Sequence, residues 1–336
     1  MAYSSEVKLL IVAPAWVGDM VMAHSLIQSL SSRPVAKIID VLAPPSTLPI
    51  ASRMNEVRKT YVLDVGHGRI GLSARMKAAA LIREESYDEV YVLPNSWKSA
   101  LVPFLARIKK RIGWLGEMRF GILNDARPLD KSALPLMVER YSALSLGKHE
   151  QFVRPALDPV LQFDVENRSR LVSRFNLSGT GAIALAPGAE FGPAKKWPVS
   201  YFADVAKYCL DSGRQVWLLG SKKDVSDCEL IETKANGAIN LAGKTSLEDV
   251  VDLISLADTL VCNDSGLMHI SAALNTKTVA LFGSTSSEYT PPLSKNSWVV
   301  SRQLDCRPCF QRVCPLGHMD CLKKIEATEI ISILDI

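Results

Sequence analysis

The sequence NDSG, Asn263 to Gly266, ends a buried apolar run and opens a helical pattern. Ser265 is a favoured helix N-cap residue, and Gly266 lets a ligand approach the backbone. The amide groups of the first helical turn therefore converge on one point that attracts phosphate. His269 lies one turn along the same face, where it can donate a hydrogen bond to a phosphate oxygen. A helix cap beside a structural histidine is the alternative interpretation.

A second polar loop, PGAEFGPAKKWP from Pro187 to Pro198, follows another expected strand. Lys195 or Lys196 within it can neutralise a diphosphate leaving group, which is electrostatic catalysis by a preplaced cation. The alternative is a solvated lysine pair packed over Trp197, and this description fits Lys196 better than Lys195.

Asp19 comes directly after the first expected strand and begins the first expected helix. A carboxylate in that place can act as a general base toward an acceptor hydroxyl. It can equally cap the helix and interact with its positive end, and the sequence does not separate these two roles.

A basic and aromatic zone runs from Trp97 to Arg127. Its charged side chains are Lys98, Arg107, Lys109, Lys110, Arg111, Arg119 and Arg127 against Glu117 and Asp125. Such a zone predicts contact with an anionic ligand or surface. A solvated basic helix face is the alternative.

The C-terminal segment 305–322 is rich in cysteine. It carries Cys306, Cys309, Cys314 and Cys321, with His318 between the last two. Their density suggests zinc or an iron–sulfur centre, but the spacing fits neither pattern well, so we expect reduced thiols without a metal. The chain also has no Asp-x-Asp pair to hold a metal-bridged nucleotide sugar.

Short runs rich in Val, Ile and Leu alternate with amphipathic segments and so position these residues. Strands are expected at 7–14, 36–44, 59–65, 88–95, 182–189, 215–221, 239–243, 259–264 and 277–284. This alternation predicts an α/β fold with parallel sheets covered on both faces, in which ligands bind beyond the carboxyl ends of the strands. The pattern weakens between Leu129 and Ser178, so we expect two doubly wound domains, residues 1–170 and 171–336, that meet at a cleft.

Composition sets limits on function. The chain has 336 residues, of which 48% are hydrophobic and 22% charged, and its net charge of +4 is too small to imply nucleic-acid binding. No apolar run approaches the roughly 20 residues of a spanning helix, and no export signal precedes the seven cysteines. A cytoplasmic protein, peripherally attached at most, is therefore expected.

The motif GHGRIG, Gly66 to Gly71, matches a dinucleotide-binding fingerprint and leaves a nicotinamide-dependent oxidoreductase as an alternative. It follows the third expected strand rather than the first, and no acidic residue ends the next strand, so we interpret it as a turn.

Several segments together resemble the heptosyltransferases of glycosyltransferase family 9. They are PAWVGDMVMAHSL, YVLPNSWKSALVPF, GWLGEMRFGILND, LPLMVERY, PGAEFGPAKKWP and NDSGLMHISAALN, and the similar blocks span about Val7 to Thr290. The resemblance implies a GT-B fold of two facing Rossmann-like domains, the first binding the acceptor and the second ADP-heptose. The cysteine-rich tail resembles only a subset of the family.

The activity implied by the resemblance is inverting and metal-independent. It transfers L-glycero-D-manno-heptose from ADP-heptose, with no further cofactor, to the first inner-core heptose on Kdo2-lipid A of a Gram-negative bacterium. The reaction would take place at the cytoplasmic face of the inner membrane. Transfer at another core position, or nucleotide binding without turnover, are the alternatives.

The resemblance also assigns residues. Asp19 matches the catalytic base, Lys195 matches the phosphate-binding lysine, and the donor-binding segment falls on Asp264, Ser265, Gly266 and His269. Glu190 and Phe191 occupy two further donor-binding positions, where the threonines of the family are missing. For the acceptor, whose Kdo and lipid A groups are anionic, we expect contacts from Lys98, Lys109, Lys110, Arg111 and Arg119.

Overall fold

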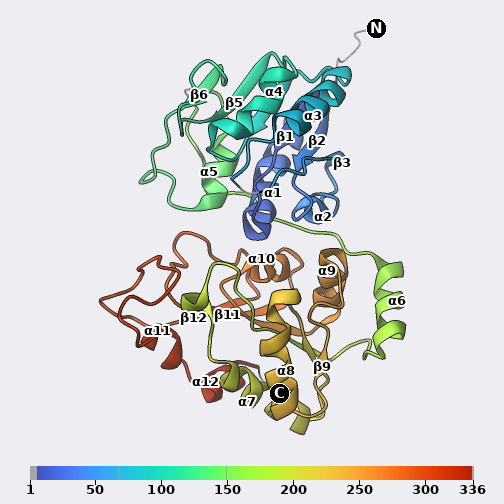
Figure 1. Cartoon of the computed structure of the whole chain (residues 1–336), viewed down its shortest axis with the longest axis vertical. Coiled ribbons are helices and arrows are strands. Elements are labelled where there is room, and N and C mark those ends of the chain that lie inside the picture. The colour runs from blue at the N-terminus through green and yellow to red at the C-terminus, as the bar shows by residue number, and fades with distance from the viewer. Residues whose placement is uncertain (1–5, 67, 149, 335–336) are drawn as a thin grey trace. The chain divides into compact units, whose positions relative to one another are not determined.

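The computed structural model describes residues 6–66, 68–148 and 150–334, and the chain divides into two units between Leu161 and Gln162 (Figure 1). The division falls before the boundary expected at residue 170. The reason is the helix α6, Val165–Phe175, whose Asn167 amide donates to Asp249 at 3.0 Å and to Asp252 at 2.8 Å on α9 of the second unit.

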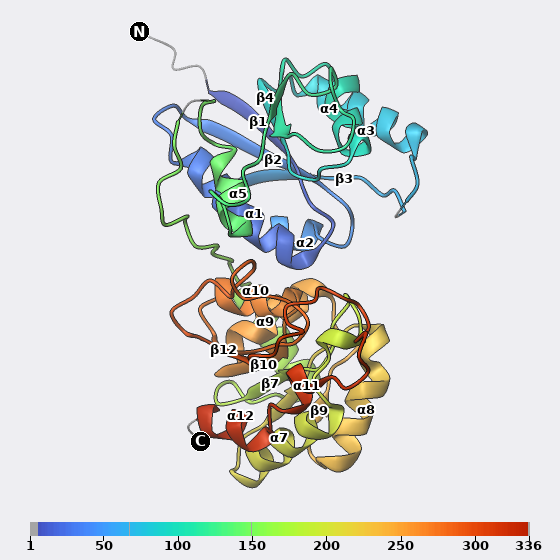
Figure 2. The ribbon, with the colours of Figure 1, turned by 90° about the vertical axis from the view of Figure 1, so that its left-hand side faces the viewer.

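The described part of the first unit is a parallel sheet of order β3-β2-β1-β4-β5-β6 with helices on both faces. Its strands are β1 Val7–Val12, β2 Lys37–Ala43, β3 Val57–Val62, β4 Glu89–Val92, β5 Lys110–Trp114 and β6 Asp125–Arg127. Its helices are α1 Val17–Ser31, α2 Leu48–Ala51, α3 Leu72–Glu84, the 3-10 turn η1 Trp97–Ala100, α4 Leu101–Leu105 and α5 Met137–Ala143. Figure 2 shows α1, α2 and α5 on one face of this sheet and α3 and α4 on the other.

The second unit repeats the scheme with sheet order β12-β11-β10-β7-β8-β9, again parallel. Its strands are β7 Ile183–Ala186, β8 Val216–Leu218, β9 Ile239–Asn240, β10 Thr259–Asn263, β11 Lys277–Phe282 and β12 Ser297–Ser301. Besides α6, its helices are η2 Pro193–Lys195, α7 Val199–Asp211, η3 Lys222–Asp224, α8 Val225–Lys234, α9 Leu247–Leu256, α10 Gly266–Ala273, α11 Asp320–Lys323 and α12 Ala327–Leu334.

The central strands of each sheet, such as β1, β7 and β10, are buried on both faces, which explains why they read as continuous apolar runs. Residues of β1 such as Leu10 pack with Ile82 of α3, while Leu185 of β7 packs in a second core with Phe202 of α7 and Ile330 of α12. The α/β class and the doubly wound repeat predicted from the sequence are confirmed, and two Rossmann-like units in one chain are what a GT-B fold requires.

The carboxyl ends of the central strands carry the residues singled out in the sequence. Asp19 follows β1, Lys195 follows β7, and Asp264 follows β10 directly. The motif at residues 66–71 is a loop between β3 and α3, apart from His67, which lies outside the described residues. Gly71 there has a φ of 58°, a conformation that glycine adopts readily, which supports the interpretation as a turn.

His24 lies in α1 and links this helix to two other segments of the first unit. Its ring is 1% exposed, Nε2 lies 2.8 Å from Glu56 Oε2, and Nδ1 accepts the Val160 N–H at 3.0 Å. Because Nδ1 accepts, the ring is neutral and its single hydrogen points to Glu56. Burial lowers the pKa of His24, and the bond to Glu56 opposes that shift only in part.

We predict that His24→Ala weakens this part of the first unit at neutral pH by about 1–3 kcal/mol, because the packing of a buried ring and two part-buried hydrogen bonds are lost. Because the folded protein favours the neutral form of His24, the interaction contributes its full stability above the ordinary histidine pKa of about 6.5. This contribution is lost as the pH falls below that value. Hydrogen exchange at α1 and residues 157–161 should therefore be faster in His24→Ala at pH 7.5, and the difference from the unmodified protein should shrink toward pH 5.

Ser32→Ala, at the exposed end of α1, is the control, since among the described residues the Ser32 hydroxyl bonds only to Gln28 O, at 2.8 Å. Equal exchange in both variants, or a difference that grows on acidification, would contradict the assignment of a neutral ring.

Candidate functional site

Asn263, the last residue of β10, connects the strand to the loop between β7 and α7. Its side chain is fully buried; Oδ1 accepts the Trp197 N–H at 3.0 Å and Nδ2 donates to Pro187 O at 2.7 Å. Both ends of the loop are thereby held beside β10. No role for Asn263 is evident from the sequence, although an amide at the end of a buried strand is suited to pairing two backbone groups.

Asp264 forms a buried ion pair with Lys195. Its Oδ2 lies 2.6 Å from Lys195 Nζ and also accepts a hydrogen bond from the Thr285 hydroxyl. The side chain of Asp264 is 4% exposed and that of Lys195 14%. The lysine therefore keeps one side open toward solvent while its charge is partly balanced. The sequence reasoning missed Thr285, which follows β11.

Lys196 points to a different part of the unit. Its Nζ lies 2.8 Å from Asp227 Oδ2 and 3.9 Å from Asp224 Oδ1, at α8 and the turn before it. Only the first lysine of the pair is thus brought to Asp264, which is the arrangement expected if Lys195 is the phosphate-binding residue.

Ser265 precedes α10 and is its N-cap residue, but its side chain makes no capping hydrogen bond, so the expected side-chain cap is wrong. Its Oγ is buried and has no hydrogen-bond partner in the described part of the chain. Gly266 is the first residue of the helix, so free amide groups of its first turn adjoin this hydroxyl. An unsatisfied buried hydroxyl beside such amides is suited to an anionic ligand.

His269 lies on the same helix, 6% exposed. Burial, with a further contribution from the Lys195 cation, lowers its pKa to about 4, against the opposing effect of Asp264. The imidazole is therefore neutral at pH 7, and it retains one N–H to donate.

Phe191 lies beside the lysine, with its ring centre 5.1 Å from Lys195 Nζ and 5.5 Å from the Arg312 guanidinium carbon. These distances are within the range of cation–π attraction. Glu190 is exposed and pairs with Lys223 instead. The two neighbouring positions therefore differ, and only Phe191 contacts the residues around Lys195.

Asp19 is the third residue of α1, half-buried in its first turn. The N-cap position is occupied by Trp16, whose side chain makes no cap bond. Asp19 is thus not the N-cap residue that the alternative interpretation supposed. A carboxylate in the first turn remains favoured by the helix dipole.

Arg119 is not a surface cation, which corrects the expectation that it contacts an acceptor. Its side chain is fully buried and donates to Pro94 O at 2.6 Å, to Asn95 Oδ1 at 3.3 Å and to Trp114 O. Burial lowers its pKa. Arg119 therefore positions the loop beyond β4 rather than binding a ligand.

The remaining basic residues of the zone are less enclosed. Lys109 and Lys110 are exposed, the latter 2.8 Å from Glu89 Oε1. Arg111 donates to Ile122 O and Ile108 O, both at 2.6 Å, while Lys98 Nζ lies 3.2 Å from Gly68 O. Some cations of the zone thus bind backbone carbonyl groups, whereas others face solvent.

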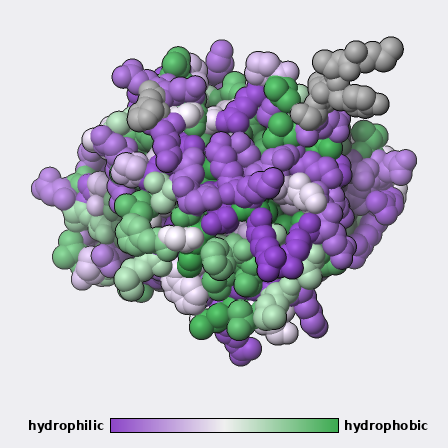
Figure 3. All heavy atoms as spheres, turned by 90° about the horizontal axis from the view of Figure 1, so that it is seen from above, coloured by the Kyte–Doolittle hydropathy of each residue, from purple (hydrophilic) through white to green (hydrophobic). Residues whose placement is uncertain are grey.

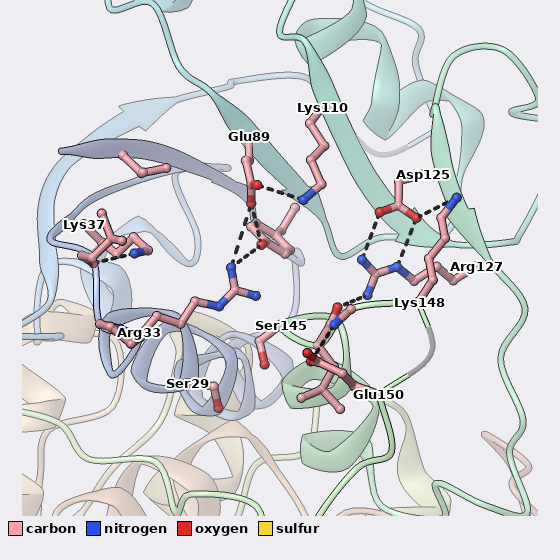
Figure 4. A pocket seen from close by; sticks show the side chains of 16 residues that line it. Ser29, Arg33, Lys37, Glu89, Lys110, Asp125, Arg127, Ser145, Lys148 and Glu150 are labelled. Carbon is pink, nitrogen blue, oxygen red and sulfur yellow. Dashed lines mark hydrogen bonds and ion pairs between the residues drawn. The ribbon is translucent and has the colours of Figure 1, made fainter. Parts of the chain in front are cut away.

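A pocket of about 830 Å³ in the first unit is shown in Figure 4. It lies at the amino ends of the strands, at Val7, Lys37, Glu89 and Lys110, the edge opposite to where ligands of such sheets bind. Its charges largely pair with one another, as in the Arg127–Asp125 contact at 2.9 Å. The carboxyl edges of the sheets are therefore better candidates for the functional site than this pocket.

Comparison with known proteins agrees with this arrangement. The sequence model of Glycosyltransferase family 9 (heptosyltransferase) matches residues 75–320. Lipopolysaccharide heptosyltransferase 2 of Escherichia coli K12 is 47% identical over 304 residues, covering 87% of each chain. Lipooligosaccharide heptosyltransferase 2 of Haemophilus ducreyi is 44% identical over 315 residues, covering 89% of each.

Among solved structures, that of E. coli ADP-heptose lps heptosyltransferase II superposes with a TM-score of 0.88 at 41% sequence identity and covers 98% of both chains. The family model covers most of the sequence, and these relatives match nearly its whole length. The chain therefore belongs to glycosyltransferase family 9, the heptosyltransferases.

Proposed function

We propose that this glycosyltransferase transfers L-glycero-D-manno-heptose from ADP-heptose to the first heptose of the lipopolysaccharide inner core. The observation that carries the proposal is the close similarity, at 43–47% identity, to four enzymes named heptosyltransferase 2. The cluster of Lys195, Asp264 and Ser265 at the start of α10 supports it, because a nucleotide diphosphate fits a lysine beside free helical amides.

In the proposed donor complex, the diphosphate lies at the amino end of α10. The amides of the first turn and the unpartnered Ser265 hydroxyl supply neutral hydrogen bonds, Lys195 supplies positive charge, and neutral His269 donates one further bond. Phe191 adds an apolar wall beside the cation. No metal ion is needed in this arrangement to balance the diphosphate.

In the proposed reaction, Asp19 takes the proton of the acceptor hydroxyl as its oxygen attacks the anomeric carbon. The new glycosidic bond forms on the face opposite ADP, the bond to the diphosphate oxygen breaks, and ADP leaves with the electron pair. Configuration inverts in this one displacement, which passes through an oxocarbenium-like state. Lys195 and the helix amides stabilise the charge that develops on the diphosphate.

For the acceptor we propose contacts from Lys98, Lys109, Lys110 and Arg111, whose charges complement Kdo carboxylates and lipid A phosphates. The described ranges contain no helix that is long and apolar enough to cross a bilayer. The face seen in Figure 3 is largely hydrophilic with scattered apolar side chains. A cytoplasmic enzyme with peripheral, mainly electrostatic contact to an anionic membrane surface fits these features.

The deciding assay offers ADP-heptose with either Kdo2-lipid A or the same molecule already bearing one heptose, in brief reactions with and without EDTA. We expect product from the heptosylated acceptor alone, at equal rates in both conditions. Product from bare Kdo2-lipid A would move the enzyme to the first core position, and ADP binding without product would indicate a nucleotide-binding protein.

Lys195→Ala should lower turnover on the order of 100-fold, the usual effect of removing one preorganised donor, whereas Lys196→Ala should change it little. The measurement is kcat at saturating donor for both variants, with thermal unfolding as a check on folding. Because Lys195→Ala leaves Asp264 as an unpaired buried charge, the double variant Lys195→Ala/Asp264→Asn is included. Activity restored in the double variant, or equal losses in the two lysine variants, would refute the role of Lys195.

Asp19→Ala should lower transfer by at least about 100-fold, since general-base catalysis typically contributes that much or more. Calorimetric titration with ADP should give nearly unchanged affinity, because the proposed base does not touch the diphosphate. Substantial residual transfer would reduce Asp19 to a residue that only favours the helix dipole.

A further inference from the structure

The four cysteines of the segment 305–322 line one small cavity in the second unit. Cys306, Cys309, Cys314 and Cys321 contribute to its wall, and its volume of about 20 Å³ is that of a site for one water molecule or ion. These cysteines are unpaired by disulfides. Sequence spacing alone did not predict that all four line the same cavity.

A buried hydroxyl of the same wall has no partner. Ser284 is 2% exposed, and its Oγ makes no hydrogen bond within the described part of the chain. Buried polar groups in native proteins are nearly always satisfied, so an orphaned one beside a cavity indicates a polar or charged occupant.

The segment after Cys314 turns back sharply. Gly317 N–H donates to Cys314 O at 3.2 Å, and Gly317 and Met319 have positive φ angles of 72° and 59°. The turn brings Met319 and Cys321 to the wall of the same cavity as Cys314.

We propose that Cys306, Cys309, Cys314 and Cys321 bind one thiolate-preferring ion, zinc or iron(II), in this cavity. The four thiols release their protons to solvent as the ion enters, and no redox step is involved. No group of three or more His, Cys, Asp or Glu side chains within residues 6–66, 68–148 and 150–334 is already placed to hold a metal. Binding therefore requires the thiols to rotate between staggered rotamers toward the cavity.

His318 also lines the cavity, but it is a poorer candidate ligand. Its Nδ1 accepts the Asp320 N–H at 2.9 Å, and Asp320 Oδ1 lies 3.3 Å from the same nitrogen. Four cysteines are sufficient for the tetrahedral coordination of a closed structural site. The ion would accordingly have no open position for a substrate.

The segment holds the loops that carry the donor cluster. Phe310 N–H donates to Ser284 O at 2.8 Å, Ala194 N–H donates to Arg312 O at 3.0 Å, and Arg307 Nη2 donates to Thr285 O at 3.1 Å. An ion that closes the cysteine loop would stiffen the backbone next to Lys195 and Thr285. This consequence for the donor site rests on the proposed function, whereas the metal site itself does not.

The test begins with the whole unmodified protein, reduced and stripped by a strong chelator under argon. It is then titrated with Zn²⁺, and separately with Fe²⁺, against a competing indicator, and metal content is measured after desalting. We expect about one tightly held equivalent of one of these ions. Replacement by Co²⁺ should give a thiolate-to-cobalt charge-transfer band.

The double variant Cys309→Ser/Cys314→Ser should lose the equivalent and the cobalt band, while Cys228→Ala, which removes a thiol from the core outside the cavity, should keep both. Less than about a tenth of an equivalent in the unmodified protein would overturn the proposal, as would full metal content in a folded double variant. If the double variant does not fold, the titration of the unmodified protein decides alone.

A second measurement concerns the donor site. Removing the ion should raise the KM for ADP-heptose several-fold and change kcat less, because the ion positions loops and does not touch substrate. Unchanged KM together with stoichiometric metal would leave the metal site in place and refute its connection to the donor loops. A protein that binds metal but transfers no heptose would refute the proposed function alone.

Discussion

The second unit depends on the buried ion pair between Lys195 and Asp264. Taking two charges out of water costs several kcal/mol per ion, and this cost is offset only where the geometry is good and the remaining hydrogen-bonding capacity is used. Thr285 supplies a donor to the carboxylate, and Asn263 fixes the loop that delivers the lysine. The loops after β7, β10 and β11 must therefore all be correctly placed before the pair can form, and the same loops form the candidate donor site.

Much of the fold could be predicted from the sequence because the signal is local. Buried parallel strands read as apolar runs, and helices between them as amphipathic segments, so the two doubly wound units followed from pattern alone. The strands β5, β6 and β12 were missed, since none of their sequences, KRIGW, DAR and SWVVS, contains a run of more than three apolar residues. The chain divides after Leu161, whereas the sequence suggested residue 170, because the polar sequence of α6 looks like a linker and its contacts with α9 are invisible in the sequence.

The candidate site could be predicted only in part. Asp19, Lys195 and the residues from Asp264 to His269 lie at strand ends, where the fold rule directs attention. The roles of Asn263 and Thr285 depend on partners 66 and 21 residues away along the chain. For Arg119 the expectation was wrong. Its residue type and spacing suggested a surface cation, whereas its side chain is buried and donates hydrogen bonds to a loop. Residue type thus identified the charges, and only the fold identified their partners.

The neutral state of His269 has a consequence for the release of product. With the imidazole uncharged, the formal charges of Lys195, Asp264 and His269 sum to zero. In the proposed reaction, ADP departs with one more negative charge than it carried in the sugar nucleotide. A strongly cationic pocket would hold this product more tightly than the substrate and slow each cycle. Here Asp264 compensates Lys195, and Arg312 beside Phe191 adds one further positive charge. Because oriented amides supply much of the proposed binding, the spent nucleotide can exchange for a new donor.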